Sequence, residues 1–104
     1  MIFYLMKSNQ NSVFITDFQK YTNNLGVLNR CNSFILSRYK RIYTISHPKT
    51  SNVRAWQGHP NEGKCFIPIR GKFLVCWVKI DDFDNPSERL KTESLILDAS
   101  KKKI

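Results

Sequence analysis

The chain has 104 residues, 41% of them hydrophobic and 12% aromatic, so it is long enough for one folded domain and too apolar to be disordered. Its 17 Lys and Arg residues outnumber its 8 Asp and Glu residues, and the formal charge of +9 favours an anionic partner such as nucleic acid, a membrane surface or a phosphorylated small molecule. No stretch approaches the roughly 20 apolar residues of a membrane helix, which argues against a helical membrane protein.

The first half of the chain alternates short β-branched and aromatic runs with turn residues, a pattern typical of strands. Residues 1–6 (MIFYLM) and 12–18 predict the first two strands. Residues 21–26 (YTNNLG) predict a turn, because Asn and Gly tolerate the left-handed region. Residues 26–33 and 41–47 predict two more strands. The leading apolar run has no basic start and no small-residue cleavage site, so we expect no signal peptide and a cytoplasmic location.

The strongest strand signal runs from residue 64 to residue 80. Residues 65–69 form one apolar run, residues 70–72 a turn, and residues 73–78 a second apolar run. Together they predict a buried β-hairpin. Pro68 has no N–H to donate to a ladder, which predicts an edge position or a bulge there.

The end of the chain predicts a loop over residues 81–86 and a last strand over residues 94–97. Many short strands with almost no helix predict an all-β fold, either a barrel or a sandwich. We expect one domain over residues 1–98, followed by a basic tail over residues 99–104.

The chain has an odd number of cysteines, and no two of them form a C-x-x-C motif. They are Cys31, Cys65 and Cys76. Two of them lie inside apolar runs. This number and placement indicate that the cysteines are small buried hydrophobic residues in a reducing compartment, and that they form no disulfide framework.

The segment at residues 52–72, NVRAWQGHPNEGKCFIPIRGK, resembles the core of two related groups of cupins. These are the dTDP-4-dehydrorhamnose 3,5-epimerases and the dTDP-sugar 3,4-ketoisomerases. The matching parts are Arg54 with the Ala-Trp-x-x-His that follows it, the Gly-Lys pair ending at Lys64, and an Arg-Gly turn that opens an apolar strand. KRIY at residues 40–43 and NPS at residues 85–87 match flanking parts of the family pattern.

The resemblance covers roughly residues 14–98 and implies a cupin-type jelly-roll barrel that forms a homodimer and needs no cofactor. A cupin metal site needs about three or four His and carboxylate ligands, and the chain has only His47 and His59, so we expect no metal. Family members continue beyond the strand that matches residues 94–97, with strands that complete the barrel. The chain therefore resembles a member whose C-terminal strands are missing.

The resemblance also implies an isomerase that acts on a dTDP-4-keto-6-deoxyhexose in deoxysugar and cell-surface polysaccharide biosynthesis. In the epimerases a His removes a proton next to the ketone, a Lys stabilises the enolate and an Arg holds the phosphates. Here Lys64 matches the Lys near the oxyanion and His59 matches the second His of the ketoisomerase motif, so we expect these two to be the catalytic residues. Arg54, Gln57 and Trp56 are the expected substrate-binding residues. Gln57 replaces the first His of the ketoisomerase motif, and an amide cannot act as the base.

Which face of the sheet each of these side chains occupies depends on whether the strand that carries them is regular. On a regular strand Gln57 and His59 share one face, and Arg54 faces away unless the strand bends or bulges near Trp56.

Two other functions stay open at this point. The glutamine at position 57 and the missing strands favour a non-catalytic relative that binds the sugar nucleotide or only dimerises. The charge of +9 favours a small basic barrel that binds nucleic acid, although no base-stacking motif supports that interpretation and we do not expect a nucleic-acid partner.

Overall fold

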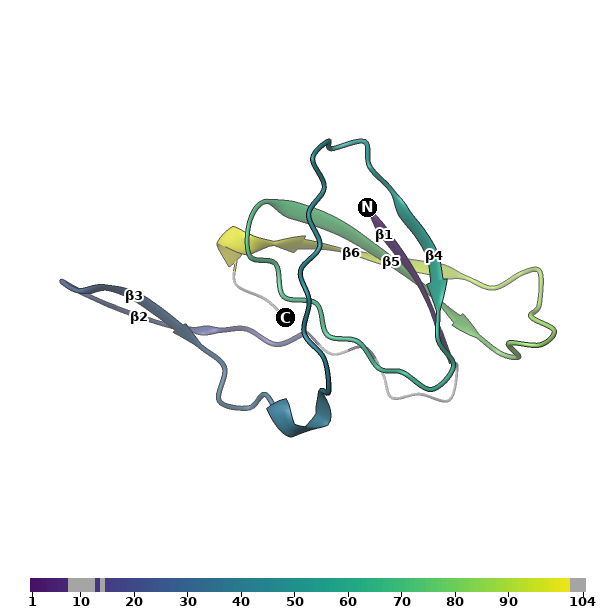
Figure 1. Ribbon diagram of the computed structural model, residues 1–104, viewed down its shortest axis with the longest axis horizontal. Coiled ribbons are helices and arrows are strands. Elements are labelled where there is room, and N and C mark those ends of the chain that lie inside the picture. Colours follow the sequence, from purple (N-terminus) through teal and green to yellow (C-terminus); the bar gives the residue numbers. More distant parts are fainter. Residues whose placement is uncertain (8–12, 14, 102–104) are drawn as a thin grey trace.

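The computed structural model describes residues 1–7, 13 and 15–101, and its regular elements are almost all strands (Figure 1). The main sheet has four strands in the order β4-β1-β5-β6. They are β1 (Ile2–Lys7), β4 (Arg54–Gly58), β5 (Lys72–Ile80) and β6 (Thr92–Asp98). The predicted all-β class is confirmed at this level.

The remaining elements are a separate hairpin and two short 3₁₀ turns. The hairpin consists of β2 (Gln19–Asn23) and β3 (Gly26–Arg30), and the turns are η1 (Leu36–Arg38) and η2 (Ala99–Lys101). The turn expected over residues 21–26 is shorter in the structure. Residues 21–23 belong to β2, the turn lies at Asn24 and Leu25, and Gly26 at the start of β3 has the positive φ of 129° that favours glycine. No described helix is long and apolar enough to cross a membrane.

The main sheet is mixed, with β1 parallel to both of its neighbours and β5 antiparallel to β6. The pairing of β1 with β5 runs from Ile2 opposite Val75 to Lys7 opposite Ile80. β5 is rich in β-branched and aromatic residues, and it lies between two strands with apolar residues on both faces. The buried core therefore gathers on β5 and the residues beside it: Ile2, Val75, Cys76, Val78, Ile80, Leu97 and Ala99.

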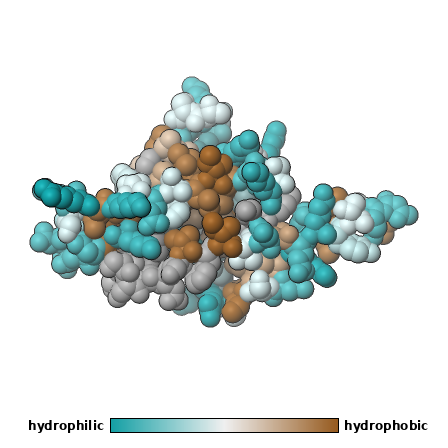
Figure 2. Space-filling view, turned by 180° about the vertical axis from the view of Figure 1, so that it is seen from behind, coloured by the Kyte–Doolittle hydropathy of each residue, from teal (hydrophilic) through white to brown (hydrophobic). Residues whose placement is uncertain are grey.

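This core is small, and many large apolar side chains remain exposed. Ile42, for example, is 95% exposed. Figure 2 shows an apolar patch in the middle of the face opposite to that of Figure 1, with hydrophilic side chains along part of its border. Contiguous exposed apolar surface commonly marks a place where another molecule packs.

Two predicted strands are wrong. Residues 41–47 and residues 65–69 form no ladder with any described strand, and they cross the sheet as irregular extended segments. Pro68 is buried within the second segment and cannot donate a ladder hydrogen bond. The predicted hairpin at residues 64–80 therefore does not form, and β5 pairs with β6 across the loop at residues 81–91.

Smaller differences occur elsewhere. The strand expected over residues 12–18 lies partly outside the described residues, and its described part contains only an isolated bridge at Asp17. The strand expected over residues 26–33 ends at Arg30. The strands expected at residues 1–6 and 94–97 are confirmed as β1 and β6.

The start of the expected basic tail is attached to the sheet. Ala99 is buried, and its N–H donates to the carbonyl of Gly71 at 3.0 Å. Gly71 has φ 75°, which lets the chain turn sharply into β5. The carboxylate of Asp98 accepts hydrogen bonds from the backbone N–H and the hydroxyl of Ser100. Residues 99–101 thus pack at the end of the β5–β6 ladder where Lys72 lies opposite Asp98. The rest of the tail lies outside the described residues.

Candidate functional site

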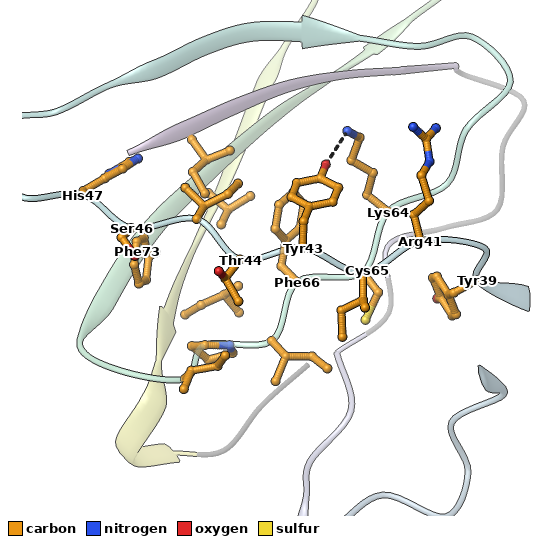
Figure 3. Close-up of a pocket in the computed structure, with 18 of the residues that line it drawn as sticks. Tyr39, Arg41, Tyr43, Thr44, Ser46, His47, Lys64, Cys65, Phe66 and Phe73 are labelled. Atoms are coloured by element: carbon orange, nitrogen blue, oxygen red, sulfur yellow. Dashed lines mark hydrogen bonds between the residues drawn. The ribbon is translucent and has the colours of Figure 1, made fainter.

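A cavity of about 1390 Å³ lies between one face of the main sheet and the two irregular segments that cross it (Figure 3). Ile2, Phe73, Val75 and Leu97 line it from the sheet. The crossing segments supply most of the remaining wall. The cavity is larger than the roughly 300–1,000 Å³ of typical small-molecule sites, so it has room for an extended ligand.

The cavity is strongly cationic. Among the described residues that line it, Glu62 is the one carboxylate, and its Oε1 accepts a hydrogen bond from Nη2 of Arg41 at 3.0 Å. The lining includes seven Lys and Arg residues: Arg38, Lys40, Arg41, Lys49, Lys64, Arg70 and Lys72. The sequence explains this bias, because residues 18–61 contain no Asp or Glu. Such a concentration of positive charge attracts anionic ligands.

Lys64 and Tyr43 form a direct contact across the cavity. The Lys64 ammonium donates a hydrogen bond to the hydroxyl of Tyr43 at 3.3 Å, and Figure 3 shows Arg41 pointing to the same side. An ammonium group has no acceptor, so the Tyr43 oxygen accepts and its own proton is free to point elsewhere. Tyr43 is 64% exposed, which leaves this hydroxyl accessible to a ligand.

His47 occupies the other end of the cavity, beside the N-terminus. Its Nδ1 lies 3.4 Å from the Met1 ammonium, which also donates to the carbonyl of Asn52 at 3.2 Å. The ring packs edge-on against Phe73, with centroids 5.8 Å apart. Burial of the ring lowers the pKa of His47 below its ordinary value of 6.5, and the Met1 ammonium and Arg54 lower it further. The neutral ring is therefore the form that this environment stabilises.

We expect the stability of the protein to decrease as the pH falls below about 6.5. Because the pKa of His47 is lower in the folded state, the unfolded chain binds more protons between that lowered value and 6.5, so acidification favours unfolding in this window. Urea unfolding measured at several pH values checks this. His47→Gln should flatten the dependence, whereas His59→Gln, which changes the other histidine, should retain it. An unchanged slope in His47→Gln would contradict the assignment.

The structure brings together only part of the predicted site. His59 and Lys64 both line the cavity. Arg54, Trp56 and Gln57 lie on β4 and are not among the residues that line it. Arg54 nevertheless lies close to one end of the cavity, because it lies opposite Ile2 in the β1–β4 ladder and its charge acts on His47, and both of those residues line the cavity.

The pairing of β4 with β1 is irregular at the position that decides which face of the sheet Arg54 occupies. Ile2 on β1 lies opposite Arg54, whereas Tyr4 lies opposite Gln57. An advance of two residues along β1 therefore corresponds to an advance of three residues along β4. One extra residue in β4 makes this a β-bulge, and it returns Arg54 and Gln57 to the same face of the sheet. Trp56 lies inside this bulge and is 45% exposed.

Sequence reasoning missed Arg41 and Tyr43 as parts of the site, and treated them only as a strand that matched the family. The usable signal was the absence of acidic residues over 18–61, because basic residues without nearby acids give the surface that they share a net positive charge.

The cysteines contribute no evident nucleophile. Burial raises the pKa of Cys65, although a hydrogen bond with Tyr39 opposes the shift. A raised pKa reduces the thiolate fraction, which is the reactive form. Cys76 is buried in the core, and Cys31 is half-buried. No cluster of three or more His, Cys, Asp or Glu suited to a metal ion occurs among the described residues.

Comparison with known proteins adds no assignment. The chain matches no protein-family model, no curated protein sequence and no solved structure.

Proposed function

We propose that the chain binds a nucleotide diphosphate sugar of the dTDP-sugar class in the cationic cavity. The observation that carries this proposal is the excess of seven Lys and Arg residues over one carboxylate in the lining. A diphosphate is recognised by such groups, and the planar fork of an arginine can hold two phosphate oxygens at once. Arg41 and Lys64 point to the same side of the cavity and are the first candidates for this contact.

The proposal extends to proton transfer next to a ketone, as in the epimerases and ketoisomerases that the sequence resembles. His59 would remove the proton and Lys64 would face the developing enolate oxygen. Their presence in one cavity supports this pair. The exposure of His59 favours the alternative of a relative that binds without catalysis, because catalytic bases are commonly shielded from water.

The cupin-type jelly roll is part of the same proposal. No other described strand pairs with either edge of the main sheet, and β5 and β6 supply one antiparallel pair of the kind that jelly rolls contain. Closing a barrel around this sheet would require further strands, and a second copy of the chain in the proposed homodimer is one source of them.

Thermal unfolding with and without dTDP tests the binding proposal. A ligand at about 100 times its dissociation constant adds about 2.7 kcal/mol to the stability of the native state, so we expect the melting temperature to rise by several degrees. Thymidine lacks the diphosphate and should give little or no shift. No shift at millimolar dTDP would overturn the proposal.

Two further measurements separate the alternatives. Solvent deuterium incorporation at the carbon next to the ketone of a dTDP-4-keto sugar would identify the isomerase, and binding without exchange would identify the non-catalytic relative. Binding of an oligonucleotide that weakens steeply with salt, without any dTDP shift, would instead support the nucleic-acid function.

A further inference from the structure

Two side-chain contacts in the wall of the cationic cavity join the same two segments of the chain. Nη2 of Arg41 donates to Oε1 of Glu62 at 3.0 Å, and the Lys64 ammonium donates to the Tyr43 hydroxyl at 3.3 Å. Both contacts span 21 residues, so alternate residues of the two extended segments face each other. Figure 3 shows Arg41 and Lys64 pointing to the same side of the cavity. Arg41, Lys64 and Glu62 therefore form one mixed-charge cluster.

Glu62 supplies the negative charge of this cluster, and it is the one carboxylate among the described residues that line the cavity. The carboxylate of Asp98 lies 3.8 Å from Lys72, which also lines the cavity, but Asp98 is not itself part of the lining. The side chains of Arg41 and Glu62 are 77% and 41% exposed, and an exposed ion pair adds little to the stability of a fold. The main effect of Glu62 is therefore electrostatic. It lowers the positive potential at the point where Arg41 and Lys64 would hold phosphates.

This carboxylate opposes the binding of any anion at the cluster, and its effect increases with the charge of the anion. At about pH 7.5 a nucleotide sugar carries about two negative charges, dTDP about three and dTTP about four, because a terminal phosphate has a second ionisation near pH 6. A lining with only its cationic side chains would favour the most highly charged nucleotide. Glu62 counteracts that preference, because it weakens the binding of the triphosphate most and that of the nucleotide sugar least.

We infer that Glu62 sets the charge selectivity of the cavity, reducing the binding of free nucleoside diphosphates and triphosphates more than that of a nucleotide sugar. The inference rests on the proposed function, because it places the phosphates beside Arg41 and Lys64. Within that function it specifies the ligand as a nucleotide whose outer phosphate is esterified. Glu62 is then a specificity-determining residue, and it takes no part in proton transfer.

Isothermal titration of the full chain with dTDP-glucose, dTDP and dTTP tests the inference, in buffer free of divalent cations that would neutralise the phosphates. Glu62→Gln removes the charge and keeps an oxygen that can accept a hydrogen bond from Arg41. We expect this variant to bind all three ligands more tightly, with a gain for dTTP at least about threefold larger than the gain for dTDP-glucose. The difference should shrink at about 0.5 M salt, which screens charges only a few ångströms apart.

Two further variants serve as controls. Glu62→Asp shortens the side chain but keeps its charge, so it should retain the selectivity of the wild type. Glu88→Gln removes an exposed carboxylate that does not line the cavity, and it should bind all three ligands as the wild type does. Thermal unfolding verifies that each variant is folded.

The possible results separate this inference from the proposed function. If the wild type binds dTDP but Glu62→Gln leaves the three affinities in the same ratio, the inference is wrong and the proposed function stands. A uniform loss of affinity in Glu62→Gln would mean that Glu62 positions Arg41, and it would also overturn the inference. If neither the wild type nor Glu62→Gln binds any of the three ligands, both the inference and the proposed function are wrong.

Discussion

Lys64→Ala is expected to weaken dTDP binding by about 10- to 100-fold, because it removes a charge-assisted hydrogen bond worth about 1.5–3 kcal/mol. Lys64 lines the cavity and also donates to Tyr43, so its loss removes a charge and frees the phenol. Isothermal titration of the wild type and the variant measures the change. Lys79→Ala removes a lysine of β5 that does not line the cavity, and it should bind as the wild type does.

Arg54→Ala provides the second half of this experiment. Arg54 does not line the cavity, so we expect a smaller effect than that of Lys64→Ala. An equal or larger loss in Arg54→Ala would contradict Lys64 and Arg41 as the first phosphate contacts. It would place the phosphates at the His47 end of the cavity, beside β4.

Leu97→Ala is expected to lower the free energy of unfolding by about 2–5 kcal/mol. Leu97 is one of the few buried side chains, and its truncation removes apolar contacts and leaves a cavity beside β5. Small domains have a total stability of about 5–15 kcal/mol, so this one change could leave little margin. Urea unfolding followed by circular dichroism measures it.

The neighbouring residue gives a matched control. Ile96 points to the other face of β6 and is 63% exposed, so Ile96→Ala should change the stability by no more than about 0.5 kcal/mol. Comparable losses in both variants would mean that the two faces of β6 are equally buried, and would contradict the described core.

The strand content was predictable from the sequence because β5 and β6 are strongly apolar and bounded by turn residues. Their partners were not predictable. The predicted hairpin joined residues 65–69 to β5 because they are close in sequence, whereas β5 pairs with β6 on one side and with β1 on the other. Residues 41–47 and 65–69 have the composition of strands, but composition cannot reveal whether a free strand edge lies beside them.

The candidate site was predictable only in part. The motif pointed to His59 and Lys64, and both line the cavity. The family resemblance also grouped Arg54, Trp56 and Gln57 with them, and these three residues do not line the cavity. The chain after β4 brings His59 and Lys64 into the same cavity as Arg41 and Tyr43, which come from a segment about 20 residues earlier. The contact between Lys64 and Tyr43 joins residues that are far apart in the sequence, so no local sequence pattern could predict it.

The position of β1 has a consequence for how the chain folds during synthesis. β1 is synthesised before β4 and β5, yet it lies between them in the sheet, and they emerge from the ribosome some fifty to seventy residues later. Until then its backbone groups have no ladder partner, and its apolar run stays accessible to other chains. Parallel pairing over such separations closes slowly, because the entropy of a long loop is lost before any contact forms. We therefore expect the nascent chain to be vulnerable to aggregation through its first residues, and to depend on chaperones for longer than a protein built from local hairpins.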